Sequence, residues 1–223
     1  MSTEPYTIYF AGDMFDHKHL AGNAILADAI EQRSNHKYKC IVPQTIEQVS
    51  NRGVDIRNMD LKHVMDCDLG IFNFDGPDLD SGTVVEFMYA KLLDIPAVIL
   101  RTDFRGGGDG DGGRLGWNLM ASFYPRTEIV KLHSLAVFRG VAERSETLEQ
   151  LLSEYYREVA GQVIAGLDKV LQMPSLMGET APLPEQVYQW ALDFPANGMA
   201  ELCGPDFVTK VLARKRSRGL LRK

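Results

Sequence analysis

Short apolar runs alternate, along the first 130 residues, with longer segments in which apolar residues recur every three or four positions. The apolar runs are rich in β-branched and aromatic residues, as buried strands are. They are Tyr6–Gly12, Tyr38–Val42, Leu69–Phe74, Ile95–Leu100 and a shorter one at Ile129–Lys131. Helical spacing predicts the intervening helices, over Leu20–Arg33, Ile56–Val64 and Thr83–Leu93. This alternation predicts an α/β fold, an open, mostly parallel five-stranded sheet of flavodoxin-like or Rossmann-like type flanked by helices.

The pattern changes at Glu146, where a long stripe of leucine, valine and tyrosine begins at helical spacing and continues to about Leu171. Residues 173–184 contain three prolines and a glycine, which is typical of a linker. A short helix is expected over Val187–Phe194, and the pattern assigns no structure to the tail that follows. We therefore expect an α/β domain over residues 1–140 and a helical C-terminal extension with a basic tail over residues 141–223.

Composition places the chain among globular proteins, with 223 residues, 45% of them hydrophobic and 24% charged. No apolar run approaches the roughly 20 residues of a membrane-spanning helix, and the first residues lack the basic and apolar regions of a signal peptide. The three cysteines are far apart and lack metal-ligand spacing, which favours a reducing compartment. We expect a cytoplasmic protein without a membrane partner.

The net charge of −6 is unevenly distributed. The last ten residues carry six positive charges and no acidic residue, which leaves −12 on the other 213 residues. An acidic body argues against a nucleic-acid partner. We expect the basic tail to be a frayed, solvated terminus.

Acidic residues gather between the third predicted strand and the helix that follows it. Residues 75–86 contain three aspartates and end in Glu86, and such strand-to-helix loops form ligand sites in open α/β sheets. One interpretation is local, because Thr83 and Glu86 have the spacing of a capping box with Thr83 as N-cap. The other is catalytic, because a helix N-terminus would hold Glu86 ionised, as a nucleophile requires. The residues alone leave both interpretations open.

Two further carboxylates are candidates for the same sheet edge. Asp60 lies on the helix before the third strand, and Asp80 precedes Glu86 by six residues. Paired carboxylates suit glycosyl transfer, in which one attacks or stabilises the anomeric carbon and the other handles the proton of the leaving group. Asp80 could accept hydrogen bonds from sugar hydroxyls. The local alternative for Asp60 is a solvated helix face.

Five segments in order and spacing resemble the nucleoside 2-deoxyribosyltransferase family. They are Tyr9–Gly12, Asn58–Leu61, Asp66–Phe72, Asp80–Glu86 and Asn118–Met120. The resemblance covers roughly residues 6–135. It raises the catalytic interpretation of residues 75–86 above the capping interpretation.

The resemblance implies a role for each matching residue. Glu86 matches the nucleophile that forms a covalent deoxyribosyl intermediate, and Tyr9 matches the tyrosine that contacts and orients it. Asp60 matches the aspartate that meets the nucleobase and takes part in its protonation. Asp80 matches a carboxylate that binds deoxyribose hydroxyls. Asn118 matches an asparagine that a neighbouring subunit supplies to the 5′ side of the sugar.

The resemblance also implies partners and further lining residues. Met120 would line the shared site, so that the protein would be a homo-oligomer acting on 2′-deoxynucleosides and free nucleobases, with no cofactor and no metal. Gly12 and Met14 follow the first strand, and Met14 stands where some members place a tryptophan that packs on the base. Gln44, soon after the second strand, is a candidate base contact. The resemblance does not account for the C-terminal extension.

The predicted function is transfer of 2-deoxyribose between nucleobases by a retaining double displacement through Glu86. The alternative is an N-glycoside hydrolase of 2′-deoxynucleoside 5′-monophosphates; Ser81 could contact a phosphate there, but Asp80 beside it would repel one. A rival from another class is a non-catalytic nucleotide or nucleoside sensor that uses the Glu146–Leu171 helix as an interaction arm. The glycine-rich stretch Arg105–Gly113 lacks the phosphate-binding motifs and is expected to be a lid or a disordered insertion.

Overall fold

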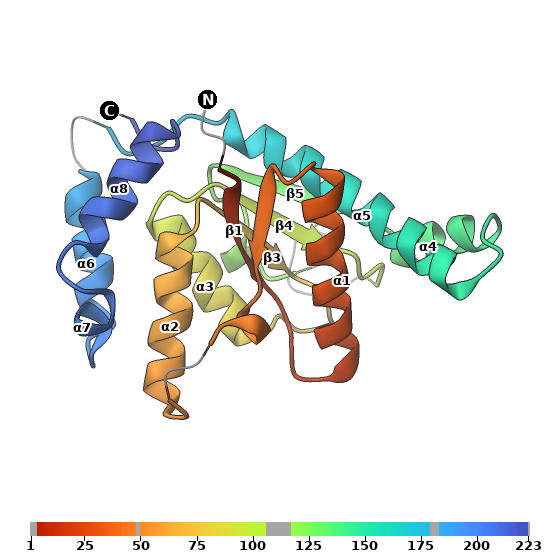
Figure 1. Ribbon diagram of the computed structural model, residues 1–223, viewed down its shortest axis with the longest axis horizontal. Coiled ribbons are helices and arrows are strands. Elements are labelled where there is room, and N and C mark those ends of the chain that lie inside the picture. Colours follow the sequence, from red (N-terminus) through yellow and green to blue (C-terminus); the bar gives the residue numbers. More distant parts are fainter. Residues whose placement is uncertain (1–3, 48–49, 106–116, 179–182, 223) are drawn as a thin grey trace.

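A parallel five-stranded sheet forms the centre of the protein (Figure 1). The computed structural model describes residues 4–47, 50–105, 117–178 and 183–222. The strand order is β2-β1-β3-β4-β5, and all four neighbouring pairs are parallel, which confirms the predicted fold class. The strands are β1 (Tyr6–Ala11), β2 (Tyr38–Ile41), β3 (Leu69–Asn73), β4 (Ala97–Arg101) and β5 (Thr127–Lys131). Strands β3 and β4 are buried almost throughout, as strands covered on both faces are.

Helices cover both faces of the sheet (Figure 1). One face packs against α1 (His17–Arg33) and α5 (Leu148–Leu171), and the other packs against α2 (Gly53–Asp66) and α3 (Ser81–Leu92). The remaining elements of this part are η1 (Pro43–Thr45), η3 (Leu119–Ala121) and α4 (Ser134–Ala142). None of the described helices combines the length and the apolarity that crossing a membrane requires.

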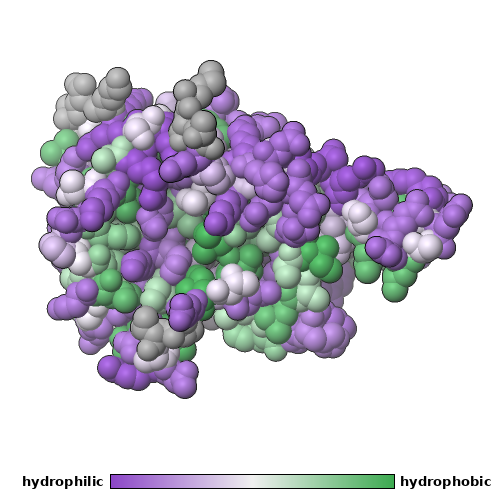
Figure 2. All heavy atoms as spheres, in the orientation of Figure 1, coloured by the Kyte–Doolittle hydropathy of each residue, from purple (hydrophilic) through white to green (hydrophobic). Residues whose placement is uncertain are grey.

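Helix α5 lies against β4 and β5 and also packs along α1. Gly166 permits this close approach, because a Cβ at that position would lie 3.0 Å from Val130 Cγ2 and 3.2 Å from Val98 Cγ2. The first part of α5 and α4 form an end that projects from the body, and its visible surface is largely hydrophilic (Figure 2). The division into domains at residue 140 remains a prediction; α5, which lies beyond it, completes the core on one face of the sheet.

The last forty residues form three helices beside α2 and α3 (Figure 1). They are α6 (Pro184–Asp193), α7 (Met199–Cys203) and α8 (Phe207–Ser217). The segment that leads to them is first held against the body by Asp94, whose Oδ2 accepts from Ser175 Oγ at 2.7 Å and from the backbone N–H of Leu176 at 2.8 Å. The described part of the expected linker is therefore fixed to the body. The glycine-rich stretch lies outside the described residues from residue 106 onward.

The basic tail is not a frayed terminus, and that prediction is wrong. Asp68 is fully buried, and its carboxylate accepts from Arg218 Nη1 at 2.6 Å and from Arg214 Nε at 3.4 Å. Lys215 is also buried, and its Nζ donates to the carbonyl oxygen of Cys67. The tail forms hydrogen bonds and ion pairs because the segment Asp66–Asp68 presents carboxylates and carbonyl oxygens at the amino end of β3.

Replacing Arg218 with methionine is expected to lower the free energy of unfolding by about 3 kcal/mol, because it leaves the buried Asp68 carboxylate short of a charged partner. The Arg218 side chain is only 6% exposed. Lys210→Met is the matched control, since Lys210 lies on α8, the helix that ends just before Arg218, in an ion pair whose side chains are 78% and 74% exposed. Exposed pairs contribute roughly 0–1 kcal/mol. Urea unfolding measures both variants, and equal stability of the two would contradict the assigned role of Arg218.

Candidate active site

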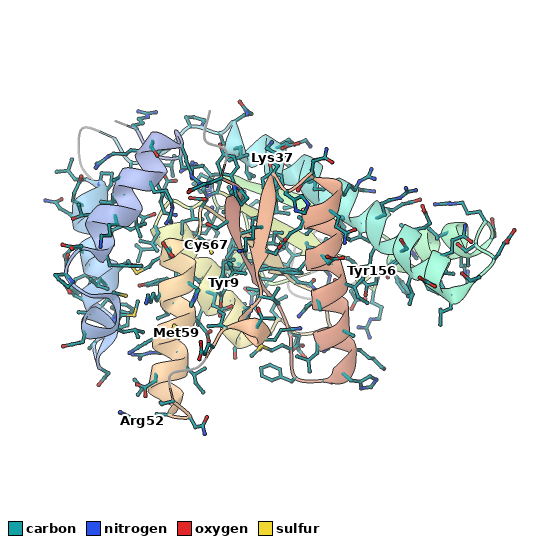
Figure 3. All side chains as sticks on the ribbon, in the orientation of Figure 1. Tyr9, Lys37, Arg52, Met59, Cys67 and Tyr156 are labelled. Carbon is teal, nitrogen blue, oxygen red and sulfur yellow. The ribbon has the colours of Figure 1, made fainter. Side chains whose placement is uncertain are left out.

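Tyr9 and Glu86 meet at the carboxyl half of the sheet. Side chains alternate along β1, so that Ile8 and Phe10 face α1 and α5 whereas Tyr9 faces α2 and α3. Figure 3 labels Tyr9 and shows it between the sheet and the α2 side of the molecule. Its hydroxyl donates a hydrogen bond of 2.6 Å to Glu86 Oε1 on α3. The structure thus brings together the two residues that the resemblance paired.

The structure does not contain the capping box of the local interpretation. Asp80, not Thr83, is the N-cap of α3, and Asp80 Oδ2 accepts from the Thr83 backbone N–H at 2.7 Å and from Thr83 Oγ1 at 2.8 Å. The helix therefore begins at Ser81, and Glu86 is its sixth residue. That position places Glu86 in the second turn, where it is bonded to Tyr9 instead of to a helix amide. Asp80 keeps one carboxylate oxygen that these two bonds do not use.

Burial controls the protonation of Glu86. Desolvation raises the pKa of Glu86 to about 7, the Tyr9 hydrogen bond opposes that rise, and the charges of Asp60 and Asp80 add to it. The expectation that the helix N-terminus would hold Glu86 ionised is therefore not met, because the helix dipole acts mainly within the first turn. Burial therefore opposes the ionised form of Glu86 that a nucleophile requires.

Asp60, Tyr9 and Glu86 form a group of three titratable side chains. Desolvation raises the pKa of Asp60 to about 6, with His63 on the same helix acting in the opposite direction. Asp60 is half-buried, and its Oδ1 atom has no hydrogen-bond partner among the described residues. Burial, followed by the charges of Glu86 and Asp60, raises the pKa of Tyr9 well above its usual value, so Tyr9 remains a donor. The group can therefore supply an attacking carboxylate and a carboxylic acid at near-neutral pH.

The sequence profile of the family described as "Nucleoside 2-deoxyribosyltransferase" matches residues 8–120, just over half of the chain. The chain belongs to this family. Membership gives the coarse chemistry, glycosyl transfer or hydrolysis on nucleosides. A comparison with curated proteins found no match.

Three solved structures are similar to this chain. A conserved protein from Enterococcus faecalis V583 is 24% identical, with a TM-score of 0.48, over 69% of this chain and 99% of that one. The 2-desoxiribosyltransferase from Leishmania mexicana is 24% identical, with a TM-score of 0.44, over 56% and 90%. A 2-deoxyribosyltransferase from Bacillus psychrosaccharolyticus is 16% identical, with a TM-score of 0.38, over 44% and 74%. Because these sequence identities and TM-scores are low, the three structures carry no argument about the chemistry of this chain.

Three predicted lining residues of this family member occupy different environments. Gly12 directly follows β1 and lies against Asn73, so that an added Cβ would be 3.1 Å from Asn73 Cβ. Met14 is half-buried in the loop that follows. Gln44 Nε2 donates to the carbonyl oxygen of Leu20 at 2.8 Å, and its buried Oε1 lacks a partner among the described residues. The Gln44 amide nitrogen thus fastens η1 to α1.

Asn118 and Met120 lie apart from the group of Tyr9, Asp60 and Glu86. Asn118 Oδ1 accepts from the backbone N–H of Met120 at 2.8 Å, so Asn118 caps η3. Both residues line a groove of about 720 Å³ along the outer side of α3. The lining of this groove does not include Tyr9, Asp60 or Glu86. Asn118 therefore lines a different hollow from the one in which Glu86 accepts the hydrogen bond of Tyr9.

Arg101, which is part of none of the motifs found in the sequence, fixes the loop between β3 and α3. Arg101 is 1% exposed, and its Nη1 donates to the carbonyl oxygens of Phe74 and Gly76. Asp75 reinforces this junction, since its carboxylate accepts from the backbone N–H and the hydroxyl of Thr102 at 2.5 and 2.7 Å. An arginine that directly follows an apolar strand was the available signal. In this member of the family, the loop that carries Asp80 is therefore held by the end of β4.

Proposed function

We propose that this chain is a nucleoside 2-deoxyribosyltransferase that transfers 2-deoxyribose from one nucleobase to another through a covalent deoxyribosyl-Glu86 intermediate. The observation that carries the proposal is the hydrogen bond from Tyr9 to Glu86, with Asp60 close enough to raise the pKa of both. A buried carboxylate oriented by a phenol suits attack on an anomeric carbon. Family membership supports the nucleoside as substrate class.

The reaction proceeds in two displacements at C1′. In the first, Glu86 Oε attacks C1′, the bond from C1′ to the base nitrogen breaks, and Asp60 gives its proton to the departing base. In the second, a different base attacks C1′ from the original side, the ester bond to Glu86 breaks, and Asp60 regains a proton from the incoming base. Two inversions give net retention. A 2′-hydroxyl would crowd the nucleophile, so deoxyribose is the preferred sugar.

The raised pKa values of Glu86 and Asp60 predict how activity depends on pH. Transfer needs ionised Glu86, whose pKa is about 7, and protonated Asp60, whose pKa is about 6. Because both conditions must hold, kcat/KM falls below about pH 6 and above about pH 7. Glu86 and Asp60 interact, so the two limbs of this pH profile report the titration of the pair.

Tyr9→Phe is expected to reduce kcat/KM about tenfold and to move the basic limb to higher pH. The reason is that the Tyr9 hydrogen bond lowers the pKa of Glu86, so its loss raises that pKa and leaves a smaller ionised fraction at neutral pH. A pH–rate profile measures the shift. Tyr6→Phe is the control, because Tyr6 lies on the same strand and packs against Tyr38 instead of the site. Identical profiles for wild type and Tyr9→Phe would contradict the orienting role.

We also propose that a neighbouring subunit completes the site with Asn118 and Met120. Support comes from the exposed apolar side chains on this surface: Met120 itself is 76% exposed, and Phe123 and Val85 are 76% and 59% exposed. Apolar residues gathered on one surface are typical of subunit contacts. Analytical ultracentrifugation tests this point, and a strictly monomeric, fully active protein would contradict it.

The reaction itself is tested by incubating the purified chain with deoxyinosine and adenine, and then with thymidine and cytosine. The proposal predicts a new deoxynucleoside together with the free donor base. Free deoxyribose without a new nucleoside would indicate water as the acceptor. Cleavage only of deoxynucleoside 5′-monophosphates would replace the proposal with the hydrolase. Tight nucleoside binding without turnover would indicate a sensor.

A further inference from the structure

Helix α2 lies between the candidate active site and the C-terminal helices (Figure 1). From this arrangement we propose that α6, α7 and their connection are part of the catalytic unit, and that Arg57 and Asn58 are positioning residues through which they hold Asp60 in place. The inference rests on the proposed function for the role of Asp60. It assigns a purpose to a segment that lies beyond residue 120, where the match to the family profile ends.

Asn58 and Arg57 join α2 to the turn between α6 and α7. Asn58 is 2% exposed, and its Nδ2 donates to the carbonyl oxygen of Asn197 at 3.0 Å. Arg57 Nη2 donates to the carbonyl oxygen of Pro195 at 2.8 Å and to Asn58 Oδ1 at 2.7 Å. Both side chains thus span more than 135 positions of sequence to reach one short turn. Asn197 has a positive φ of 51°, so this turn has a defined conformation that offers its carbonyl oxygens to α2.

The geometry of the helix relates this contact to Asp60. Successive residues of an α-helix are rotated by about 100°, so Asn58 and Asp60 point in nearly opposite directions. The C-terminal turn therefore holds α2 from the side opposite the site, while Asp60 faces Tyr9 and Glu86. A movement of α2 at Asn58 would move the Asp60 carboxylate by a similar distance, because the helix is rigid over two residues.

The same C-terminal helices also fasten α3, which carries Glu86. Tyr89 Oη donates to the carbonyl oxygen of Ala191 on α6 at 2.5 Å, and Tyr188 Oη donates to that of Leu93 at 3.1 Å. Side chains of α2, α3, α6, α7 and α8 form one continuous apolar cluster that also includes Tyr9. Both helices that carry the proposed catalytic carboxylates are thus fixed to the same support. A misplacement of about 1 Å can cost on the order of 100-fold in rate.

Asn58→Ala provides the test, because it removes the link to Asn197 and leaves every side chain of the site unchanged. Gln189→Ala is the matched control, since the exposed Gln189 side chain also lies on α6 but donates to Asp193 of the same helix instead of to α2. Arg57→Met is the second variant, and it serves if Asn58→Ala does not fold. The first readout is the titration of the Asp60 carboxyl carbon by ¹³C NMR in the full-length protein, and the second is kcat and KM for base exchange.

The charged and titratable groups that act on Asp60 are His63 on its own helix, Tyr9 on β1 and Glu86 on α3. Asn58→Ala changes none of them. A loosened α2 admits water to Asp60, and its pKa then falls from about 6 toward the usual value of roughly 4. We expect kcat to fall about tenfold with a smaller change in KM, the acidic limb to move to lower pH, and Gln189→Ala to match wild type.

The outcomes separate this inference from the proposed function. If wild type exchanges bases and folded Asn58→Ala keeps both its kcat and the Asp60 titration, the inference is overturned while the function stands. If wild type exchanges no bases but the Asp60 titration shifts in Asn58→Ala, the proposed function fails and the structural link holds. A loss of rate equal in Asn58→Ala and Gln189→Ala would also overturn the inference, because it would indicate a general effect of altering the C-terminal helices.

Discussion

Glu86→Ala is expected to reduce base exchange by about 10⁴-fold or more, because removing a covalent nucleophile eliminates the route through the intermediate. The variant should fold normally. The variant loses the hydrogen bond from Tyr9, but the loss of a buried carboxylate whose pKa is raised to about 7 relieves a desolvation cost that offsets it. Initial rates of deoxyadenosine formation from deoxyinosine and adenine measure the effect.

Glu86→Gln and Glu149→Gln are the controls for this prediction. Glu86→Gln keeps an oxygen that accepts from Tyr9 but cannot form a productive ester, so it should be as inactive as Glu86→Ala. Glu149 lies in the first turn of α5, far along the chain from the site residues, and its replacement should leave the rate unchanged. Exchange by Glu86→Gln within tenfold of wild type would show that the nucleophile is another group.

Asp60→Asn is expected to reduce base exchange by about 10²–10⁴-fold, the usual contribution of a positioned general acid. It should also change the shape of the pH profile. Without the Asp60 proton, the rate depends only on ionised Glu86, so it rises with pH and then stays level. The removal of the Asp60 charge lowers the pKa of Glu86, so the midpoint of this rise falls below about pH 7.

The choice of donor base supplies the control for Asp60→Asn. A base that leaves readily without protonation should be transferred with a much smaller loss than a purine that needs a proton. Asp55→Asn is the matched variant, since Asp55 lies in the first turn of the same helix and bonds with Ser50 outside the site. An unchanged bell-shaped profile in Asp60→Asn would contradict the assignment of the general acid.

The sheet was predictable because its signals are local. Strands such as Leu69–Asn73 and Ala97–Arg101 are continuous apolar runs, and burial on both faces requires that composition. Tyr9 and Glu86 were also predictable as a pair, because a resemblance in five ordered segments fixed their positions in the fold. Loop geometry was less predictable: Asp80 and Thr83 are both acceptable N-caps, and the choice between them depends on the approach of the chain from the fixed loop.

The C-terminal extension shows where local signals end. Six positive charges near a terminus resemble a solvated tail, yet Lys215 is buried and the Arg218 side chain is only 6% exposed. Their partners, the backbone of Cys67 and the carboxylate of Asp68, lie about 150 positions away in the sequence. Helix α7 has only five residues, too few for a periodic pattern. The pKa of Glu86 likewise depends on tertiary burial, which no local spacing reveals.

The central claim is that Glu86 becomes covalently bonded to the sugar. The most direct measurement is the mass of the protein, and then of its peptides, after rapid acid quenching of a reaction with deoxyinosine and no acceptor base. The proposed mechanism predicts a population heavier by one deoxyribosyl group, with the added mass on the peptide that contains Glu86, and its disappearance when adenine is added before the quench. Base exchange at the full rate with no such adduct, or with the adduct on another residue, would contradict it.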